Sequence, residues 1–150
     1  MAEGKKARMI GVNHVVLEVG DLDEALEFYG RIFDVRVRRR SDTNAFVDMG
    51  DQFIQFSLGK QQGPDDKRHF GLVVDDREPV RKALEEMGIE MITRMNFRDP
   101  WGNRIEIVGY EDIQFTKAPH VLRGMELEDL GKTEAAQEEL AQKGMAEKAQ

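Results

Sequence analysis

The chain has 150 residues, of which 40% are hydrophobic and 34% charged, and this composition suits one folded domain with a single core. A net charge of −7 disfavours general nucleic-acid binding, and the absence of cysteine excludes disulfides, thiolate metal sites and cysteine nucleophiles. No apolar run approaches the roughly 18 residues of a membrane span, and polar residues interrupt the first 19 residues. We therefore expect a cytoplasmic protein without a signal peptide or a membrane partner.

The first half of the chain predicts a strand, a helix and three further strands. Residues 12–19 alternate between apolar and polar side chains, as a half-buried strand does. Asp21 and Glu24 have the spacing of a capping box and predict a helix that continues to Phe33. Three short strands are predicted next, near 36–40, 45–49 and 52–58, before a loop at 59–66.

The second half repeats this order. Residues 68–74 predict a strand with His69 in second place, and Asp75 or Asp76 can cap a helix that ends at Gly88. Further strands are predicted near 89–94, 95–99 and 104–109, with a turn at 99–103. The chain thus divides into two similar modules, at about 9–58 and 67–110.

Two of the three histidines occupy equivalent places in the modules. If Leu17 and Leu72 face the helices, His14 and His69 project to the opposite face, and Glu106 can join them by the same alternation. Two imidazoles and a carboxylate form the facial triad that binds a divalent metal with open coordination positions. On the residues alone, a structural role for these histidines stays open beside the metal site.

Several motifs extend this pattern. They are Asn13-His14-Val15, Asp21-Leu22-Asp23-Glu24-Ala25, His69-Phe70-Gly71-Leu72, Leu84-Glu85-Glu86-Met87-Gly88 and the segment Asp99-Pro100-Trp101-Gly102-Asn103-Arg104-Ile105-Glu106. Over residues 9–110 the chain resembles the vicinal oxygen chelate superfamily. The resemblance implies an α+β fold of two βαβββ modules that form a cupped mixed sheet. It also implies one divalent ion (Zn, Ni, Mn or Fe) at His14, His69 and Glu106, a small-molecule substrate with vicinal oxygens, and a homodimer.

Gln55 departs from the family's pattern. It stands where bacterial-type glyoxalase I has a glutamate, and a carboxamide cannot accept a proton as a carboxylate does. The chain therefore resembles the thiol transferases or ring-cleaving dioxygenases more closely, with Gln55 as a group that orients substrate. Glu18 is a candidate second acid, or else a residue of the rim.

Arg104 shares the face of Glu106 and is a candidate ligand for a substrate carboxylate or phosphonate. Arg98 and Tyr110 are weaker candidates for substrate contact. Each has a structural alternative: an ion pair for the arginines and packing for the tyrosine. The basic run at 36–40 is either a solvated strand face or a guide for an anionic substrate.

Residues 111–150 lie outside the shared pattern and form a polar extension, with seven acidic residues against three lysines from Glu126 onward. Thr133 can cap a helix that ends near Lys143, and Gly144 stops it. Such a helix could cover the cup, contact a neighbouring subunit or fray.

The sequence as a whole predicts a metal-dependent enzyme of the glyoxalase or dioxygenase type. Its reaction class stays open among lyase, isomerase, thiol-transfer and ring-cleavage chemistry. The first alternative is a non-catalytic protein that sequesters a drug or metabolite, as bleomycin-resistance proteins do. The second is a structural or regulatory module with vestigial ligands.

Overall fold

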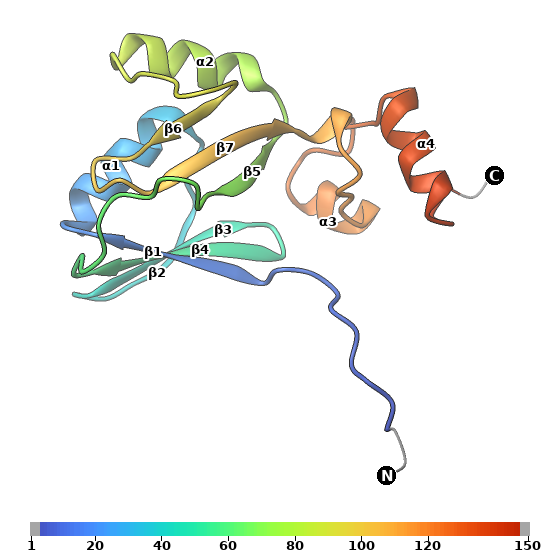
Figure 1. Ribbon diagram of the computed structural model, residues 1–150, viewed down its shortest axis with the longest axis horizontal. Helices are drawn as coiled ribbons and strands as arrows, with labels where there is room; N and C mark the ends of the chain where they lie inside the picture. The colour runs from blue at the N-terminus through green and yellow to red at the C-terminus, as the bar shows by residue number, and fades with distance from the viewer. Residues whose placement is uncertain (1–3, 148–150) are drawn as a thin grey trace.

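The computed structural model describes residues 4–147 and has an α+β fold with two mixed sheets (Figure 1). The first sheet has the strand order β1-β4-β3-β2 and the second the order β5-β7-β6. Each sheet joins one parallel pair, β1 with β4 or β5 with β7, to antiparallel neighbours. The strands are β1 (His14–Val19), β2 (Val37–Arg40), β3 (Asn44–Met49), β4 (Gln52–Leu58), β5 (Phe70–Val74), β6 (Asn96–Arg98) and β7 (Arg104–Gly109).

The predicted strand at 89–94 is wrong. The segment forms turns instead: Arg94 has a φ of 49°, and the backbone N–H of Ile92 bonds the carbonyl of Asn96. The β-branched residues Ile92 and Thr93 imitate a strand locally, but this backbone conformation folds the chain back before β6. The described second module therefore has three strands, and His69 lies directly before β5 rather than within it.

Both predicted helices begin at an aspartate cap. The Asp21 carboxylate accepts from the Glu24 backbone N–H at 2.8 Å, and α1 runs from Leu22 to Ile32. Asp76, rather than Asp75, caps α2 (Arg77–Glu86) and accepts from the backbone N–H of Glu78. Gly88 follows α2 with a φ of 67°, the left-handed conformation that a glycine after a helix provides.

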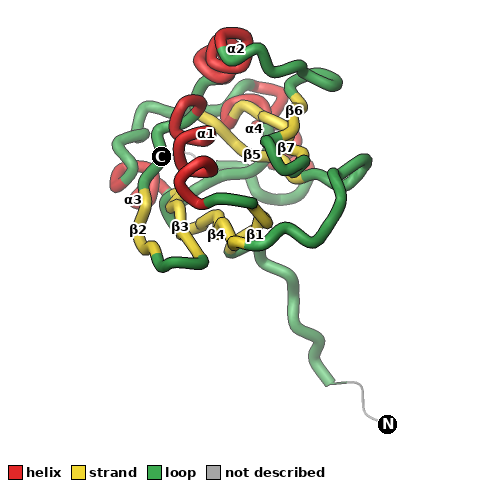
Figure 2. Tube along the Cα trace, turned by 90° about the vertical axis from the view of Figure 1, so that its left-hand side faces the viewer, coloured by secondary structure: helices red, strands yellow, loops and turns green. Residues whose placement is uncertain are grey.

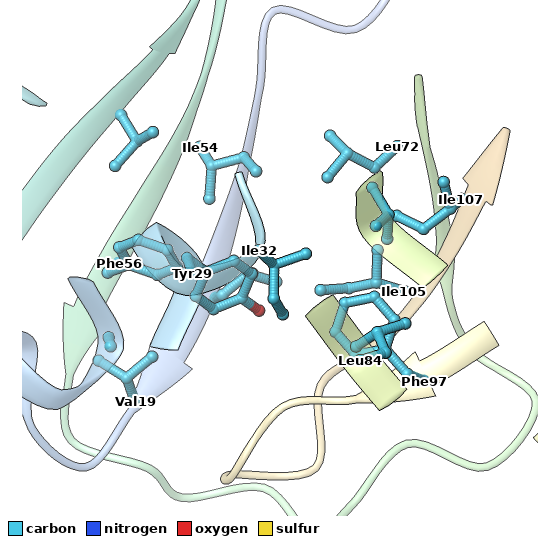
Figure 3. Packing of buried hydrophobic residues seen from close by; sticks show 14 of the residues in the cluster. Val19, Tyr29, Ile32, Ile54, Phe56, Leu72, Leu84, Phe97, Ile105 and Ile107 are labelled. Atoms are coloured by element: carbon cyan, nitrogen blue, oxygen red, sulfur yellow. The ribbon is translucent and has the colours of Figure 1, made fainter. Parts of the chain in front are cut away.

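The core lies between the two sheets, with α1 among its contributors (Figures 2 and 3). Alternate residues of β1, β3, β4 and β7 point into it, so that Leu17, Phe56 and Ile105 are buried there. Leu72 is also buried, which confirms the predicted orientation of the helix-facing sides. The intervening residues of β1, β4 and β7, among them His14, Gln55 and Glu106, lie outside the core.

Beyond β7, the chain forms η1 (Tyr110–Asp112), α3 (Pro119–Gly124) and α4 (Glu134–Gln142) at one end of the molecule (Figure 1). The Thr133 hydroxyl accepts from the backbone N–H of Ala136, the contact expected of a cap for α4. Residues 148–150 of the predicted extension lie outside the described part. Among the described helices, none is long and apolar enough to cross a membrane.

Candidate metal site

His69, directly before β5, faces Glu106 of the neighbouring strand β7. The Nε2 atom of His69 lies 3.3 Å from the Glu106 Oε2 atom, and the two side chains are 37% and 28% exposed. The His69 Nδ1 atom lies 2.8 Å from the carbonyl oxygen of Lys67, which can only accept a hydrogen bond. Nδ1 is thus the donor, and Nε2 is the ring nitrogen that faces Glu106. A backbone acceptor that orients the imidazole in this way is typical of metal-binding histidines.

His14 lies apart from this pair. Its ring stacks on Phe53 at 4.7 Å between centroids, and its Nδ1 atom is 2.8 Å from the Asn13 Oδ1 atom. In residues 4–147 of a single chain, no three His, Asp or Glu side chains gather as a metal site. One chain therefore brings together His69 and Glu106 but not His14.

Gln55 and Glu18 have different surroundings. The Gln55 amide donates to the Asn44 Oδ1 atom at 2.9 Å within the first sheet. The Glu18 carboxylate accepts from the backbone N–H groups of Gln61 and Gln62, each at 3.3 Å. Glu18 also lines a cavity of about 420 Å³ that His69 borders. Within one chain Glu18 thus shares this cavity with the predicted ligand His69.

Arg104 and Arg98 are partners in the β6–β7 register, and both bind the segment between the modules. The Arg104 guanidinium donates to the Asp66 carbonyl at 2.6 Å and to the Asn96 Oδ1 atom at 3.0 Å. The Arg98 Nε atom donates to the Asp65 carbonyl at 2.9 Å. These contacts give both arginines a structural role on the strands that hold Glu106.

Tyr110 is 5% exposed and anchors the extension. Its hydroxyl accepts from the Lys117 backbone N–H at 3.2 Å, and the Lys132 ammonium lies 3.4 Å from the ring centroid. Burial lowers the pKa of Lys132. The contacts of Tyr110 are those of a packing residue.

The sequence interpretation missed a cluster of aromatic rings and arginine beside His14. The Arg38 guanidinium lies 5.5 Å from the Phe46 ring centroid and 5.1 Å from that of Phe53. Its Nε atom donates to the Asp48 carboxylate at 2.8 Å. The sequence does indicate this cluster, because Phe46 and Phe53 alternate with the buried residues of their strands and therefore point away from the core.

The turn between β6 and β7 joins the two modules. The buried Asp99 carboxylate accepts from the Tyr29 hydroxyl at 2.8 Å and from the Asn103 backbone N–H at 2.9 Å. The Asn103 amide in turn donates to the Glu18 carbonyl at 3.0 Å. Burial, reinforced by the Asp99 charge, raises the pKa of Tyr29 well above its ordinary value. These hydrogen bonds of Asp99 and Asn103, which we call the joint, hold β7 and its Glu106 against the first module.

Two curated proteins resemble the chain. Metallothiol transferase FosB of Bacillus licheniformis is 22% identical over 116 residues, which cover 67% of this chain and 75% of that protein. Glutathione transferase FosA of Serratia marcescens is 28% identical over 111 residues, covering 64% of this chain and 78% of that protein.

Solved structures share the fold. The fosfomycin resistance protein FosX of Listeria monocytogenes has a TM-score of 0.58 at 18% identity, covering 68% of this chain and 94% of that chain. A variant of the Listeria protein, with Mn(II) and 1S,2S-dihydroxypropylphosphonic acid bound, has a TM-score of 0.58 at 20% identity and covers 67% of this chain and 92% of that chain. The model of the Glyoxalase/Bleomycin resistance protein/Dioxygenase superfamily matches residues 11–107. The chain therefore belongs to that superfamily.

Proposed function

We propose that this protein is a divalent-metal-dependent enzyme that acts on a small substrate with adjacent oxygen atoms. The observation that carries the proposal is the His69–Glu106 pair, with Nε2 and Oε2 3.3 Å apart and the imidazole oriented by Lys67. One imidazole and one carboxylate need a third ligand to form a facial triad. His14, at the equivalent place in the other module, is the candidate.

The third ligand comes from a second copy of the chain in this proposal. His14 is remote from the pair within its own chain, whereas β1 and β5 are both edge strands of their sheets. Edge strands of two copies can pair with each other. A two-fold axis between them would bring each His14 toward the partner's pair and create two equivalent sites in a homodimer.

When bound, a divalent cation polarises substrate oxygens and organises them for reaction. The residues of the chain supply the rest. His69, Glu106 and His14 bind the ion and leave coordination positions open for substrate. The cluster of Arg38, Phe46 and Phe53 offers apolar surface and positive charge beside His14. Since the Gln55 amide cannot take up a proton, Gln55 would orient substrate and would not serve as the base that isomerisation needs.

Metal titration of protein purified without added metal tests the proposal. We expect about one ion per chain, and an affinity loss of at least about 100-fold in His69→Ala, Glu106→Gln or His14→Ala, since each removes one of three ligands. The matched control is His120→Ala, because His120 is exposed on α3. Stoichiometric metal in the double variant His14→Ala/His69→Ala would rule the site out.

A second candidate function is metal-independent sequestration of a ligand. The stack of His14 on Phe53 under Arg38 favours it, because such a surface can hold a planar or anionic ligand without a metal. The two functions differ in one measurement. Ligand binding that survives a chelator supports sequestration, whereas binding lost with the metal and restored by it supports the enzyme.

A further inference from the structure

We propose that the N-terminal arm of one copy, residues 4–13, docks on the C-terminal extension of a second copy. The inference rests on the paired chains of the proposed function and adds an interaction surface that the metal site does not need. It assigns a role to the two segments outside the sheets.

The arm leaves the body of the protein as an extended segment before β1 (Figure 1). Met9 and Ile10 are fully exposed, and Val12 is 62% exposed. Three large apolar side chains lie exposed along four residues of coil, and burial of this apolar surface against a partner would be favourable. The arm is also basic, through Lys5, Lys6 and Arg8.

The extension offers the complementary surface. Together with β5 and the start of β1 it borders a groove of about 1700 Å³, which we call the extension groove. Its apolar lining includes side chains that the fold leaves half-buried, namely Phe115, Leu127, Leu130 and Leu140. The lining also has more acidic residues (Asp75, Glu128, Glu134, Glu138 and Glu147) than basic ones (Lys117, Arg123 and Lys132). A basic segment with an apolar centre therefore matches the groove in both charge and polarity.

The strand geometry directs the arm to this groove. If the edge strands of two copies meet antiparallel and His14 lies beside His69, β1 itself runs past the start of β5, and the arm residues 9–13 run along residues 70–74. Val74 pairs with Gly109, directly before the extension begins at Tyr110. The arm thus continues from the edge of β5 onto the extension of the second copy. In its own chain the arm borders the groove at residues 10–13, yet Ile10 stays fully exposed.

Cysteine cross-linking tests this docking against a clean background, because the sequence contains no cysteine. An Ile10→Cys chain is mixed with a mass-tagged Gln137→Cys chain, where Gln137 is an exposed residue of the groove, and the mixture is oxidised. We expect a disulfide-linked adduct of the two different chains. The matched control is Glu86→Cys, an equally exposed helical position on α2, which should give no adduct.

Two further variants define the occupant of the groove. In the double variant Ile10→Cys/Gln137→Cys, a disulfide within one diluted chain would show that the arm folds onto its own extension and would overturn the proposal. Met9→Asp/Ile10→Asp should weaken the dimer about tenfold or more in sedimentation, since it removes apolar burial. Unchanged dimer affinity in this variant would also overturn the proposal.

Metal titration of the same samples separates this inference from the proposed function. A metal-binding dimer that forms no adduct overturns arm docking and leaves the enzyme proposal intact. An adduct in a dimer that binds no metal supports arm docking and overturns the enzyme proposal. A protein that sediments as a monomer at all concentrations overturns arm docking and the shared site together.

Discussion

The Tyr29 hydroxyl donates a 2.8 Å hydrogen bond to the Asp99 carboxylate across 70 residues of sequence. Both residues are buried, so this bond joins α1 of the first module to the turn before β7 in the second. It is a direct polar contact of the two modules inside the core. Its removal tests how strongly the modules depend on each other.

Tyr29→Phe should lower the free energy of unfolding by about 1–3 kcal/mol, since the buried Asp99 carboxylate loses a donor and the ring remains. Urea denaturation measures the change. Tyr110→Phe is the control. It should lower the free energy of unfolding less, because the Tyr110 hydroxyl only accepts a longer bond, 3.2 Å, from a backbone N–H in the extension. Equal stability of wild type and Tyr29→Phe would contradict a structural role for the joint.

The same residue predicts a loss of stability at high pH. Burial and then the Asp99 charge raise the pKa of Tyr29 above its unfolded value of 10.0. Its contribution is therefore complete below pH 10.0 and declines as the pH rises toward the folded pKa, because the unfolded state loses its proton first. Denaturation followed from pH 8 to 12 should show this decline in wild type and a shallower one in Tyr29→Phe.

Subunit mixing tests the shared site. When His14→Ala and Glu106→Ala chains exchange freely, half of the dimers are hybrids with one intact site, which restores about a quarter of the wild-type metal sites. The control mixture of His69→Ala and Glu106→Ala should restore none, because these two ligands come from the same chain. Equal recovery in both mixtures would contradict the proposed division of the ligands.

Gln55→Glu should raise isomerase activity on hemithioacetals from little or none in the wild type. A carboxylate at this position would supply the general base that the amide lacks, and one general base contributes roughly 10²–10⁴ in rate. The assay compares both proteins with the same metal content. An efficient wild-type isomerase would place the base elsewhere, and Glu18→Gln would be the next variant to measure.

The extension should loosen in acid. The Lys117 ammonium binds Asp51 and the Met49 carbonyl, and this hydrogen bond lowers the pKa of Asp51 from its ordinary 3.8. The ion pair is thus present above pH 3.8 and is lost as the pH falls through the lower folded pKa. Lys117→Met should expose the backbone of residues 115–125 to hydrogen exchange already at neutral pH. Unchanged exchange would assign the docking of the extension to its apolar contacts alone.

Local patterns predicted the fold well, because alternation and capping act within a few residues. The Asp21 cap and the burial of Leu17 and Leu72 could be predicted from neighbouring residues in the sequence alone. The prediction of a strand at 89–94 failed because Ile92 and Thr93 favour a strand, whereas no short sequence pattern marks the left-handed conformation of Arg94. The site was harder to predict, because the contacts of Arg98 and Arg104 with residues 65 and 66 join segments that are far apart in the sequence.

Hydrogen bonds hold the connection between the modules at both ends, and this affects how fast two chains associate and exchange. Glu18 binds the backbone of Gln61 and Gln62, while Arg98 and Arg104 bind Asp65 and Asp66. These contacts oppose an outward swing of the connection that would let modules trade places between chains. Two folded copies should therefore associate in a single bimolecular step whose rate follows concentration, and their exchange should be limited by dissociation and not by unfolding.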